Sequence, residues 1–278
     1  MSDFIGTKLT MNLGERSYDI IVKRGSLENL YQFARLDRRV AVVTDSGVPA
    51  QYAQMVADQC KDATIITVPQ GEASKSFKIL ETVLRQMLDF GMGRGDLVVA
   101  VGGGVVGDLA GFAASIYMRG IDFINCPTTT LSMIDSSIGG KTAVDLGDTK
   151  NIVGAFWQPK LVIVDPDTLS TLPRRHFING LAEAVKAGLL ADPELFSIFE
   201  KEDVDDRIGD IICRSLRFKK SIVEQDETEQ GMRKALNFGH TIGHGIEAVK
   251  GIKGRRTTGL FHGECVALGM LCLLYTSP

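Results

Sequence analysis

The chain has 278 residues, of which 44% are hydrophobic and 23% are charged, and its formal net charge at pH 7 is −3. This length accommodates one large domain or two ordinary ones, and the composition is typical of a water-soluble globular protein. The near-neutral charge leaves no electrostatic footprint for nucleic acid and no apolar run reaches membrane-spanning length, so we expect neither nucleic acid nor a membrane as a partner.

The N-terminal part of the sequence predicts strands that alternate with helices. Residues 7–13 and 17–22 predict a hairpin around a turn at Gly14 and Glu15. Short apolar runs predict buried strands at 40–44, 64–68, 97–101, 121–126 and 161–164, and helical periodicity lies at roughly 47–60, 75–90 and 104–118. This rhythm is typical of an open α/β domain with a mostly parallel, Rossmann-like sheet.

After Asp165 and Pro166 the pattern becomes almost continuously helical. Helical periodicity lies at roughly 174–190, 193–200, 205–225, 230–249 and 262–275. We therefore expect an α/β domain over residues 1–170 and an all-helical domain over residues 171–278. The last apolar helix stops at Thr276-Ser-Pro278 without a cap or a tail, which predicts a chain truncated at its C-terminus.

The cysteines and the N-terminus bear on the cellular compartment. The five cysteines are scattered, odd in number and without C-x-x-C spacing, which argues against a disulfide framework and fits a reducing cytosol. The first residues lack the apolar core of a signal peptide. We expect a cytoplasmic protein.

A glycine-rich turn, Gly102-Gly-Gly104-Val-Val-Gly107-Asp108, follows an expected strand and opens an expected helix. Glycines let the backbone approach a pyrophosphate, and a helix N-terminus offers free N–H groups. The usual dinucleotide pattern also has an acidic residue ending the next strand, which here runs into Asn125-Cys-Pro127. We interpret the turn as a phosphate-binding loop, with Asp45 as the better ribose ligand; a tight packed turn is the alternative.

A polar stretch follows. Pro127-Thr-Thr-Thr130, Asp135-Ser-Ser-Ile-Gly-Gly-Lys141-Thr142 and Lys150-Asn151 place hydroxyls and lysines beyond strand ends, which suits a phosphorylated ligand. An ordinary polar loop is the alternative. The Gly-Gly-Lys-Thr run is not a P-loop, because the first glycine of that motif is missing at position 135, so an ATPase is disfavoured.

Three of the four histidines, His240, His244 and His262, gather near the end of the sequence. His240 and His244 are four residues apart on an expected helix and share a face. Catalytic zinc usually takes three protein ligands, so His240 and His262 need a carboxylate partner, either Glu183 or Glu264. Packed histidines and a surface ion pair at Glu183 are the alternatives.

Together these residues resemble the 3-dehydroquinate synthase family over essentially the whole chain. The resemblance rests on an ordered set of motifs: Pro69-x-Gly71-Glu72-x-x-Lys75, Gly102–Asp108, Arg119-Gly120, Pro127–Thr130, Asp135–Thr142, Asp165-Pro166, Leu172-Pro173, Gly180-x-Ala-Glu183-x-x-Lys186, Asp226-Glu227, Leu236–His244 and His262-Gly-Glu264. Each motif is modest alone, but the ordered set is specific.

The resemblance implies an NAD-binding domain, a metal domain and a cleft between them. It implies zinc or cobalt on Glu183, His240 and His262. The catalytic residues it implies are His244, Lys141, Lys186 and Asn151. The NAD contacts it implies are Asp45, Glu72, Lys75, Gly104, Val105, Val106, Gly107, Asp108, Thr128, Thr129, Lys141, Lys150, Thr168, Leu169, Ser170 and Thr171. The substrate contacts it implies are Arg119, Asp135, Lys141, Asn151, Lys186, Lys219, Arg233 and Asn237, with Arg119 reaching across from the neighbouring subunit of a homodimer.

The implied reaction is the second step of the shikimate pathway. It converts the sugar acid phosphate DAHP (3-deoxy-D-arabino-heptulosonate 7-phosphate) to 3-dehydroquinate and phosphate, as a phosphorus–oxygen lyase. In the family NAD+ transiently oxidises the C5 hydroxyl while zinc polarises its oxygen, phosphate leaves, the hydride returns, and ring opening and an aldol step close the carbocycle.

Three alternatives stay open. One is another sugar phosphate cyclase, and one is a metal-dependent alcohol or glycerol dehydrogenase that releases NADH. The third is an inactive truncated fragment that binds NAD only. The presence of Asn151, Lys186, Lys219, Arg233 and His244 favours the synthase, because in the family those positions read the acid and the phosphate of its substrate.

Overall fold

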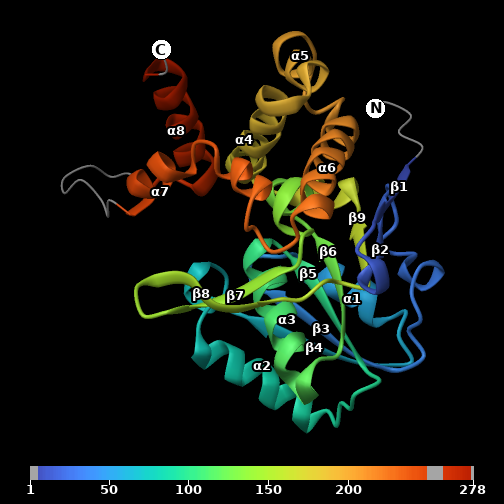
Figure 1. Ribbon diagram of the computed structural model, residues 1–278. Helices are drawn as coiled ribbons and strands as arrows, with labels where there is room; N and C mark the ends of the chain where they lie inside the picture. The colour runs from blue at the N-terminus through green and yellow to red at the C-terminus, as the bar shows by residue number, and fades with distance from the viewer. Residues whose placement is uncertain (1–5, 249–258, 277–278) are drawn as a thin grey trace.

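The computed structural model describes residues 6–248 and 259–276, which form a sheet-based half and a helical half (Figure 1). A seven-stranded sheet has the order β1-β2-β9-β6-β5-β3-β4. Its strands are β1 (Thr7–Met11), β2 (Tyr18–Val22), β3 (Arg39–Asp45), β4 (Asp62–Val68), β5 (Leu97–Gly102), β6 (Asp122–Pro127) and β9 (Leu161–Val164). The β1–β2 pair is the predicted antiparallel hairpin, and the other neighbours in this sheet are parallel, which confirms the predicted mostly parallel sheet.

Both faces of the sheet are covered. The covering helices are α1 (Ala50–Ala57), α2 (Phe77–Asp89) and α3 (Gly104–Ile116). Side chains alternate along a strand, so β3 sends Val40 and Val42 into the core beside α1 and sends Ala41 and Val43 into the core beside α2 and α3. Burial on both faces explains why these strands appear in the sequence as continuous apolar runs.

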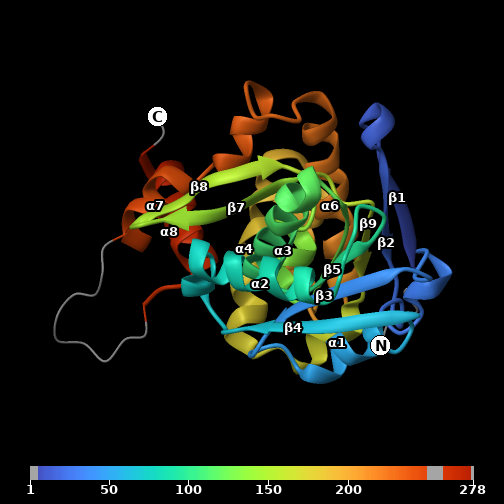
Figure 2. The same cartoon turned by 90° about the horizontal axis from the view of Figure 1, so that it is seen from below.

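A two-stranded hairpin, β7 (Lys141–Leu146) and β8 (Thr149–Phe156), was not predicted from the sequence. It reaches beneath the helical half (Figure 1), and in the view from below its turn overlaps α7 (Figure 2). Every residue of β8 is exposed or half-buried, and its first three residues are polar, so it differs from the buried strands of the large sheet. Lys141, Thr142, Lys150 and Asn151, for which an ordinary polar loop was the alternative to a ligand-binding stretch, therefore lie in a strand pair.

The helical half contains α4 (Arg174–Ala191), α5 (Pro193–Lys201), α6 (Ile208–Gln225), α7 (His240–Ala248) and α8 (His262–Thr276). The prediction of one helix over 230–249 is wrong: a 3-10 turn, η7 (Met232–Asn237), precedes α7, and residue 249 lies outside the described residues. The break is at Gly239, whose φ is +80°. A Cβ there would lie 2.6 Å from Met270 Cγ, so the chain turns directly against α8.

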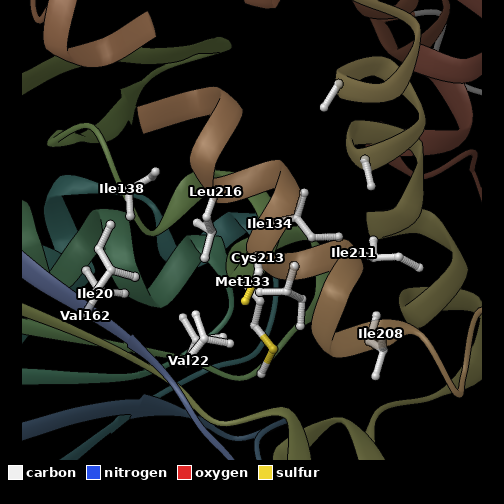
Figure 3. Close-up of a cluster of buried hydrophobic side chains, with 14 of the residues drawn as sticks. Ile20, Val22, Met133, Ile134, Ile138, Val162, Ile208, Ile211, Cys213 and Leu216 are labelled. Carbon is white, nitrogen blue, oxygen red and sulfur yellow. The ribbon is translucent and has the colours of Figure 1, made fainter. Parts of the chain in front are cut away.

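One apolar core joins the two halves. It contains Ile20 and Val22 of β2, Val162 of β9, and Ile211 and Leu216 of α6 (Figure 3). A short π-helical segment, η5 (Ser132–Ser136), adds two further buried side chains to this core. The helical half is thus packed on the sheet. Among the described residues, no helix is long and apolar enough to span a bilayer.

Candidate active site

The sheet topology predicts where a ligand binds. From β3 the chain continues outward to β4, whereas from β5 it continues in the other direction to β6 and β9. The strand order therefore reverses between β3 and β5. In open α/β sheets, ligands bind in the crevice at the carboxyl ends of the strands beside such a reversal.

Asp45 and Gly102 end the two strands at this reversal. Asp45 is buried, and its Oδ1 accepts hydrogen bonds from the backbone N–H groups of Gly47 (2.7 Å) and Val48 (3.2 Å). Gly103 precedes α3, which begins at Gly104 without a side-chain cap. The first N–H groups of α3 therefore have no side-chain cap, a geometry compatible with the phosphate-binding loop expected from the sequence.

The other residues expected to contact NAD are spread around these strand ends. Thr128 donates its backbone N–H to Gly102 (2.9 Å), and the Thr129 hydroxyl accepts from Ser132 N–H (3.2 Å). In the 3-10 segment η6 (Pro166–Thr171), Leu169 is buried in the core, and Thr171 lies 3.0 Å from the Tyr52 hydroxyl. Glu72 is exposed in a short turn before α2.

Lys75 connects α3 to the hairpin. Its buried ammonium pairs with Asp108 at 2.6 Å and donates to the Asn151 side chain. Burial raises the pKa of Asp108, although the charge of Lys75 opposes that shift. Asn151 has a φ of +55°, and its backbone N–H donates to Asp145 Oδ1 at 2.8 Å. The left-handed turn at Asn151 directs this side chain at Lys75.

A cavity of about 490 Å³ opens beside the hairpin. Its lining includes five residues expected from the sequence to contact NAD or substrate: Asp108, Asp135, Lys141, Asn151 and Lys219. Phe156 and Ile152 contribute apolar wall. Charged and amide side chains on an apolar frame suit a small polar ligand.

Two buried lysines stand at the inner end of this cavity. Lys219 on α6 pairs with Asp135 Oδ1 at 2.9 Å and donates to the Asp135 carbonyl at 2.8 Å. Burial opposes ionisation of Asp135, but the charges of Lys219 and Lys186 hold the pKa of that carboxyl well below its usual value. Burial lowers the pKa of Lys219. A water-sized space of about 10 Å³ lies among Asp135, Glu183, Lys186 and Lys219.

Glu183, His240 and His262 come together from three helices. Their ligand atoms all lie within 4.8 Å of one another. Glu183 Oε1 is 3.5 Å from His240 Nε2 and 3.7 Å from His262 Nε2. The His240 Nδ1 lies 3.2 Å from the Phe238 carbonyl, which turns its Nε2 towards the carboxylate.

The carboxylate of Glu183 is buried and under-satisfied. Neither of its oxygens forms a well-aligned hydrogen bond, although the ammonium of Lys186, three residues on, pairs with it. Burial opposes ionisation, yet His262 and Lys186 hold the pKa of Glu183 below its usual value. Desolvation lowers the pKa of His262, but Glu183 and Glu247 reverse this and raise it to about 9. A buried anion between two imidazole nitrogens is a donor set for a divalent cation.

Glu264, the competing carboxylate, lies elsewhere. It pairs with Arg175 at 2.7 Å and accepts the Phe261 backbone N–H at 2.9 Å. The structure thus favours Glu183 over Glu264 as the partner of the two histidines. His244 does not pair with Glu183 within the described chain, and its ring stands 5.7 Å from that of His262.

Two acidic residues were missed in the sequence. Glu229 pairs with Lys141 and accepts from the Asn237 side chain at 3.2 Å, at the mouth of the cavity. Glu247 pairs with Lys150 and lies beside His262. Glu247 carried a signal, because it stands three residues after His244 on one helix and therefore shares its face. We find no comparable signal for Glu229.

Two arginines expected to contact substrate are not among the residues that line the cavity, although Arg233 stands 5.9 Å from the ring of the lining residue Phe156. Arg233 is buried and donates to the carbonyls of Gly139 (3.0 Å) and Glu227, so it braces the Gly139 turn. Arg119 follows the far end of α3, in a turn with a φ of +71°. The 13 residues of α3 separate it from Gly104 by about 20 Å.

The fold and this site define an enzyme that joins a nucleotide-type α/β sheet to a helical half bearing a Glu-His-His cluster. Comparison with known families makes the assignment specific. Residues 65–179 match the model of the 3-dehydroquinate synthase N-terminal region, and residues 180–278 match that of the C-terminal region. The chain belongs to the 3-dehydroquinate synthase family, whose members are phosphorus–oxygen lyases, which confirms the resemblance noted in the sequence.

Individual relatives support the same assignment. The 3-dehydroquinate synthase of Pelobacter propionicus is 44% identical over 276 residues, which cover 95% of this chain and 76% of the relative. A crystal structure of 2-deoxy-scyllo-inosose synthase with carbaglucose-6-phosphate, NAD+ and Co2+ superposes with a TM-score of 0.86 at 28% identity, over 95% of this chain and 75% of that one. A 2-epi-5-epi-valiolone synthase from Streptomyces hygroscopicus subsp. jinggangensis 5008 with NAD+ and Zn2+ bound gives 0.79 at 30% identity, over 93% and 74%.

Proposed function

We propose that this chain converts DAHP to 3-dehydroquinate and phosphate with NAD+ bound at the β3–β5 reversal and zinc or cobalt bound by Glu183, His240 and His262. The observation that carries the metal assignment is the buried, under-satisfied carboxylate of Glu183 between two imidazole nitrogens. When bound, the metal polarises a substrate oxygen and NAD+ reversibly accepts a hydride.

The donor groups on the chain fit both cofactors. At the metal, one carboxylate and two histidines leave a coordination position open, as catalytic zinc requires. At the nucleotide, the uncapped N-terminus of α3 lies at the same edge of the sheet as Asp45, because β5 and β3 are parallel neighbours. The Asp45 Oδ1 already accepts the backbone N–H groups of Gly47 and Val48. We therefore assign the ribose hydroxyls to Asp45 Oδ2.

The chain's own residues bind and orient the substrate. Lys219, Lys186 and Lys141 supply positive charge around the cavity and its inner end, where a phosphate and a carboxylate must both be neutralised. The Lys219–Asp135 pair keeps this ammonium fixed at 2.9 Å from its carboxylate. Fixed charges in a partly dry site stabilise charge that develops on the substrate better than water does.

We assign His244 a proton-transfer role. Its side chain is exposed, but partial desolvation still lowers its pKa, so the ring is neutral at pH 7 and able to accept a proton. It lies beside His240 and His262 without sharing their contact with Glu183. Asn151 and Asn237 extend from the hairpin and from η7 towards the same cavity, where their amides suit the substrate hydroxyls.

The domain roles and the assembly are part of the proposal. Residues 1–170 would form the NAD-binding domain and residues 171–278 the metal domain. Arg119 would act on the active site of a second copy in a homodimer, because the length of α3 keeps it from its own. The described cysteines form no disulfide, which accords with the cytoplasm.

The test is phosphate release from DAHP by the purified chain loaded with NAD+ and zinc. The proposal expects one phosphate per DAHP with no net NADH, because the hydride returns to the substrate. Net NADH from an alcohol would instead support a dehydrogenase. NAD+ binding without any phosphate release would identify a fragment that only binds the nucleotide.

A further inference from the structure

Glu247 lies in α7, and its carboxylate stands between two groups from other parts of the fold. One oxygen is 2.8 Å from the Lys150 ammonium on β8, and the other is 3.5 Å from His262 Nδ1 on α8. Its side chain is 23% exposed, so the carboxylate is largely withdrawn from water. These contacts lower the pKa of Glu247 to about 2, the His262 hydrogen bond being the largest cause.

The two nitrogens of the His262 ring face two different carboxylates. Nε2 points towards Glu183 at 3.7 Å, and Nδ1 points towards Glu247 at 3.5 Å. A ring nitrogen that binds a metal must be unprotonated, so the proton of the neutral ring must then reside on the other nitrogen. An acceptor beside that second nitrogen selects the tautomer and orients the ring.

We propose that Glu247 is a positioning residue that holds His262 with Nε2 directed at the metal. The inference rests on the metal set assigned under the proposed function. His240 provides an internal parallel, because the Phe238 carbonyl stands 3.2 Å from its Nδ1 while its Nε2 faces Glu183. Each ligand histidine thus has its own acceptor, a backbone carbonyl in one case and Glu247 in the other.

A second cluster shares His262 with the proposed metal set. It consists of His244, Glu247 and His262, whose ligand atoms lie within 4.8 Å of one another. Direct binding of a metal by Glu247 is therefore the competing assignment. A lysine pair does not separate the two carboxylates, because Glu247 pairs with Lys150 and Glu183 pairs with Lys186. Their positions do: Glu183 is 2% exposed with Oε1 between the Nε2 atoms of two histidines, whereas Glu247 is 23% exposed and pairs with His262 through Nδ1.

Lys150 connects Glu247 to the β7–β8 hairpin. Its ammonium reaches Glu247 from β8, which runs beneath α7 (Figures 1 and 2). The contact joins the hairpin to the helix that carries His240. The orientation of His262 is thereby linked to the position of the β7–β8 hairpin, which packs on α3.

The experiment measures Zn2+ affinity of the full chain by competition with a chromophoric chelator. We expect Glu247→Ala to weaken zinc binding about 10- to 100-fold, the usual cost of losing such an outer partner. Glu247→Gln should lose less than Glu247→Ala, because its amide oxygen can still accept from Nδ1–H. Glu81→Ala, which removes an exposed glutamate paired with Arg85 on α2, is the matched control and should not change the affinity.

The outcomes are distinguishable. Equal affinities of Glu247→Ala and Glu81→Ala would overturn the inference. Equal losses in Glu247→Ala and Glu247→Gln, as large as that in His240→Ala, would make Glu247 a direct ligand and also overturn it. If circular dichroism shows Glu247→Ala to be unfolded, Glu247→Gln decides: several-fold weaker binding supports the inference and unchanged binding overturns it. Failure of the unsubstituted chain to bind zinc would instead refute the proposed metal set.

Discussion

His240 and His244 stand one turn apart on α7 with ring centroids 5.4 Å apart, yet of these two described rings only that of His240 pairs with Glu183, at 3.5 Å. Neighbours on one helix face therefore have different surroundings. We expect His244→Ala to reduce kcat by about 10²- to 10⁴-fold, the usual contribution of a general acid or base, with zinc content unchanged. Metal analysis of the purified variant checks this expectation, and loss of zinc would make His244 a ligand.

The buried Lys186–Glu183 pair predicts a stability effect that depends on metal. Their side chains are 4% and 2% exposed, so Lys186→Ala would leave a buried carboxylate without its cation. We expect the metal-free variant to lose about 3–5 kcal/mol of unfolding free energy. Added zinc should reduce the difference in unfolding free energy between Lys186→Ala and the unsubstituted chain, because it supplies positive charge at the Glu183 carboxylate.

Urea denaturation with and without zinc measures both effects. Lys220→Ala is the matched control, because its pair with Glu224 is more exposed and should contribute at most about 1 kcal/mol. Equal destabilisation of Lys186→Ala with and without zinc would show that the metal does not bind at Glu183.

The raised pKa of His262 predicts proton release on metal binding. Its pKa of about 9 in the metal-free protein means that the ring is protonated at pH 7, whereas burial lowers the pKa of His240 and keeps that ring neutral. A metal must displace the His262 proton, so apparent affinity should rise with pH and level off above about 9. Calorimetry at pH 7 in buffers of different ionisation enthalpy should report about one proton per zinc, and no release would contradict the assignment.

The position of Asp45 at the end of β3 predicts that this residue contributes to NAD+ affinity. We expect Asp45→Asn to weaken NAD+ binding about 10- to 100-fold, since hydrogen bonds to a charged group contribute about 1.5–3 kcal/mol. The asparagine retains a side-chain oxygen for the Gly47 and Val48 N–H groups, so the turn should persist. Isothermal titration with NAD+ measures the change. Asp37→Asn, at an exposed ion pair with Arg35, is the control. An equal loss of NAD+ affinity in Asp37→Asn would show that Asp45 does not bind the nucleotide.

Much of the fold could be predicted from the sequence, because buried strands and amphipathic helices leave periodic apolar patterns. The strands at 97–102 and 161–164 lie within a residue of their expected bounds. The hairpin was missed, since only Val153 and Ala155 of β8 pack on the core and neither is fully buried, so β8 leaves no strongly apolar pattern. The break at Gly239 was missed because it depends on the close approach of α8.

The candidate site was predictable where spacing along one helix carries the chemistry. Glu183 and Lys186 share a face of α4, and His240 and His244 share a face of α7. The choice between Glu183 and Glu264 required the structure, because the sequence does not show that Arg175 pairs with Glu264. Glu229 could not be assigned at all, since its pairing with Lys141 spans separate elements.

The β7–β8 register restricts how this gene can change in length. Val144 pairs with Val153 and Leu146 with Thr149, so residues 150–152 stand opposite Asp145 alone. This bulge lets the adjacent residues Lys150 and Asn151 reach two different partners, Glu247 and Lys75. Inserting or deleting one residue between positions 145 and 151 would exchange or remove these contacts even if every side chain were retained. Codon-sized insertions and deletions should therefore be purged here, while substitutions on the exposed side of α2 accumulate freely.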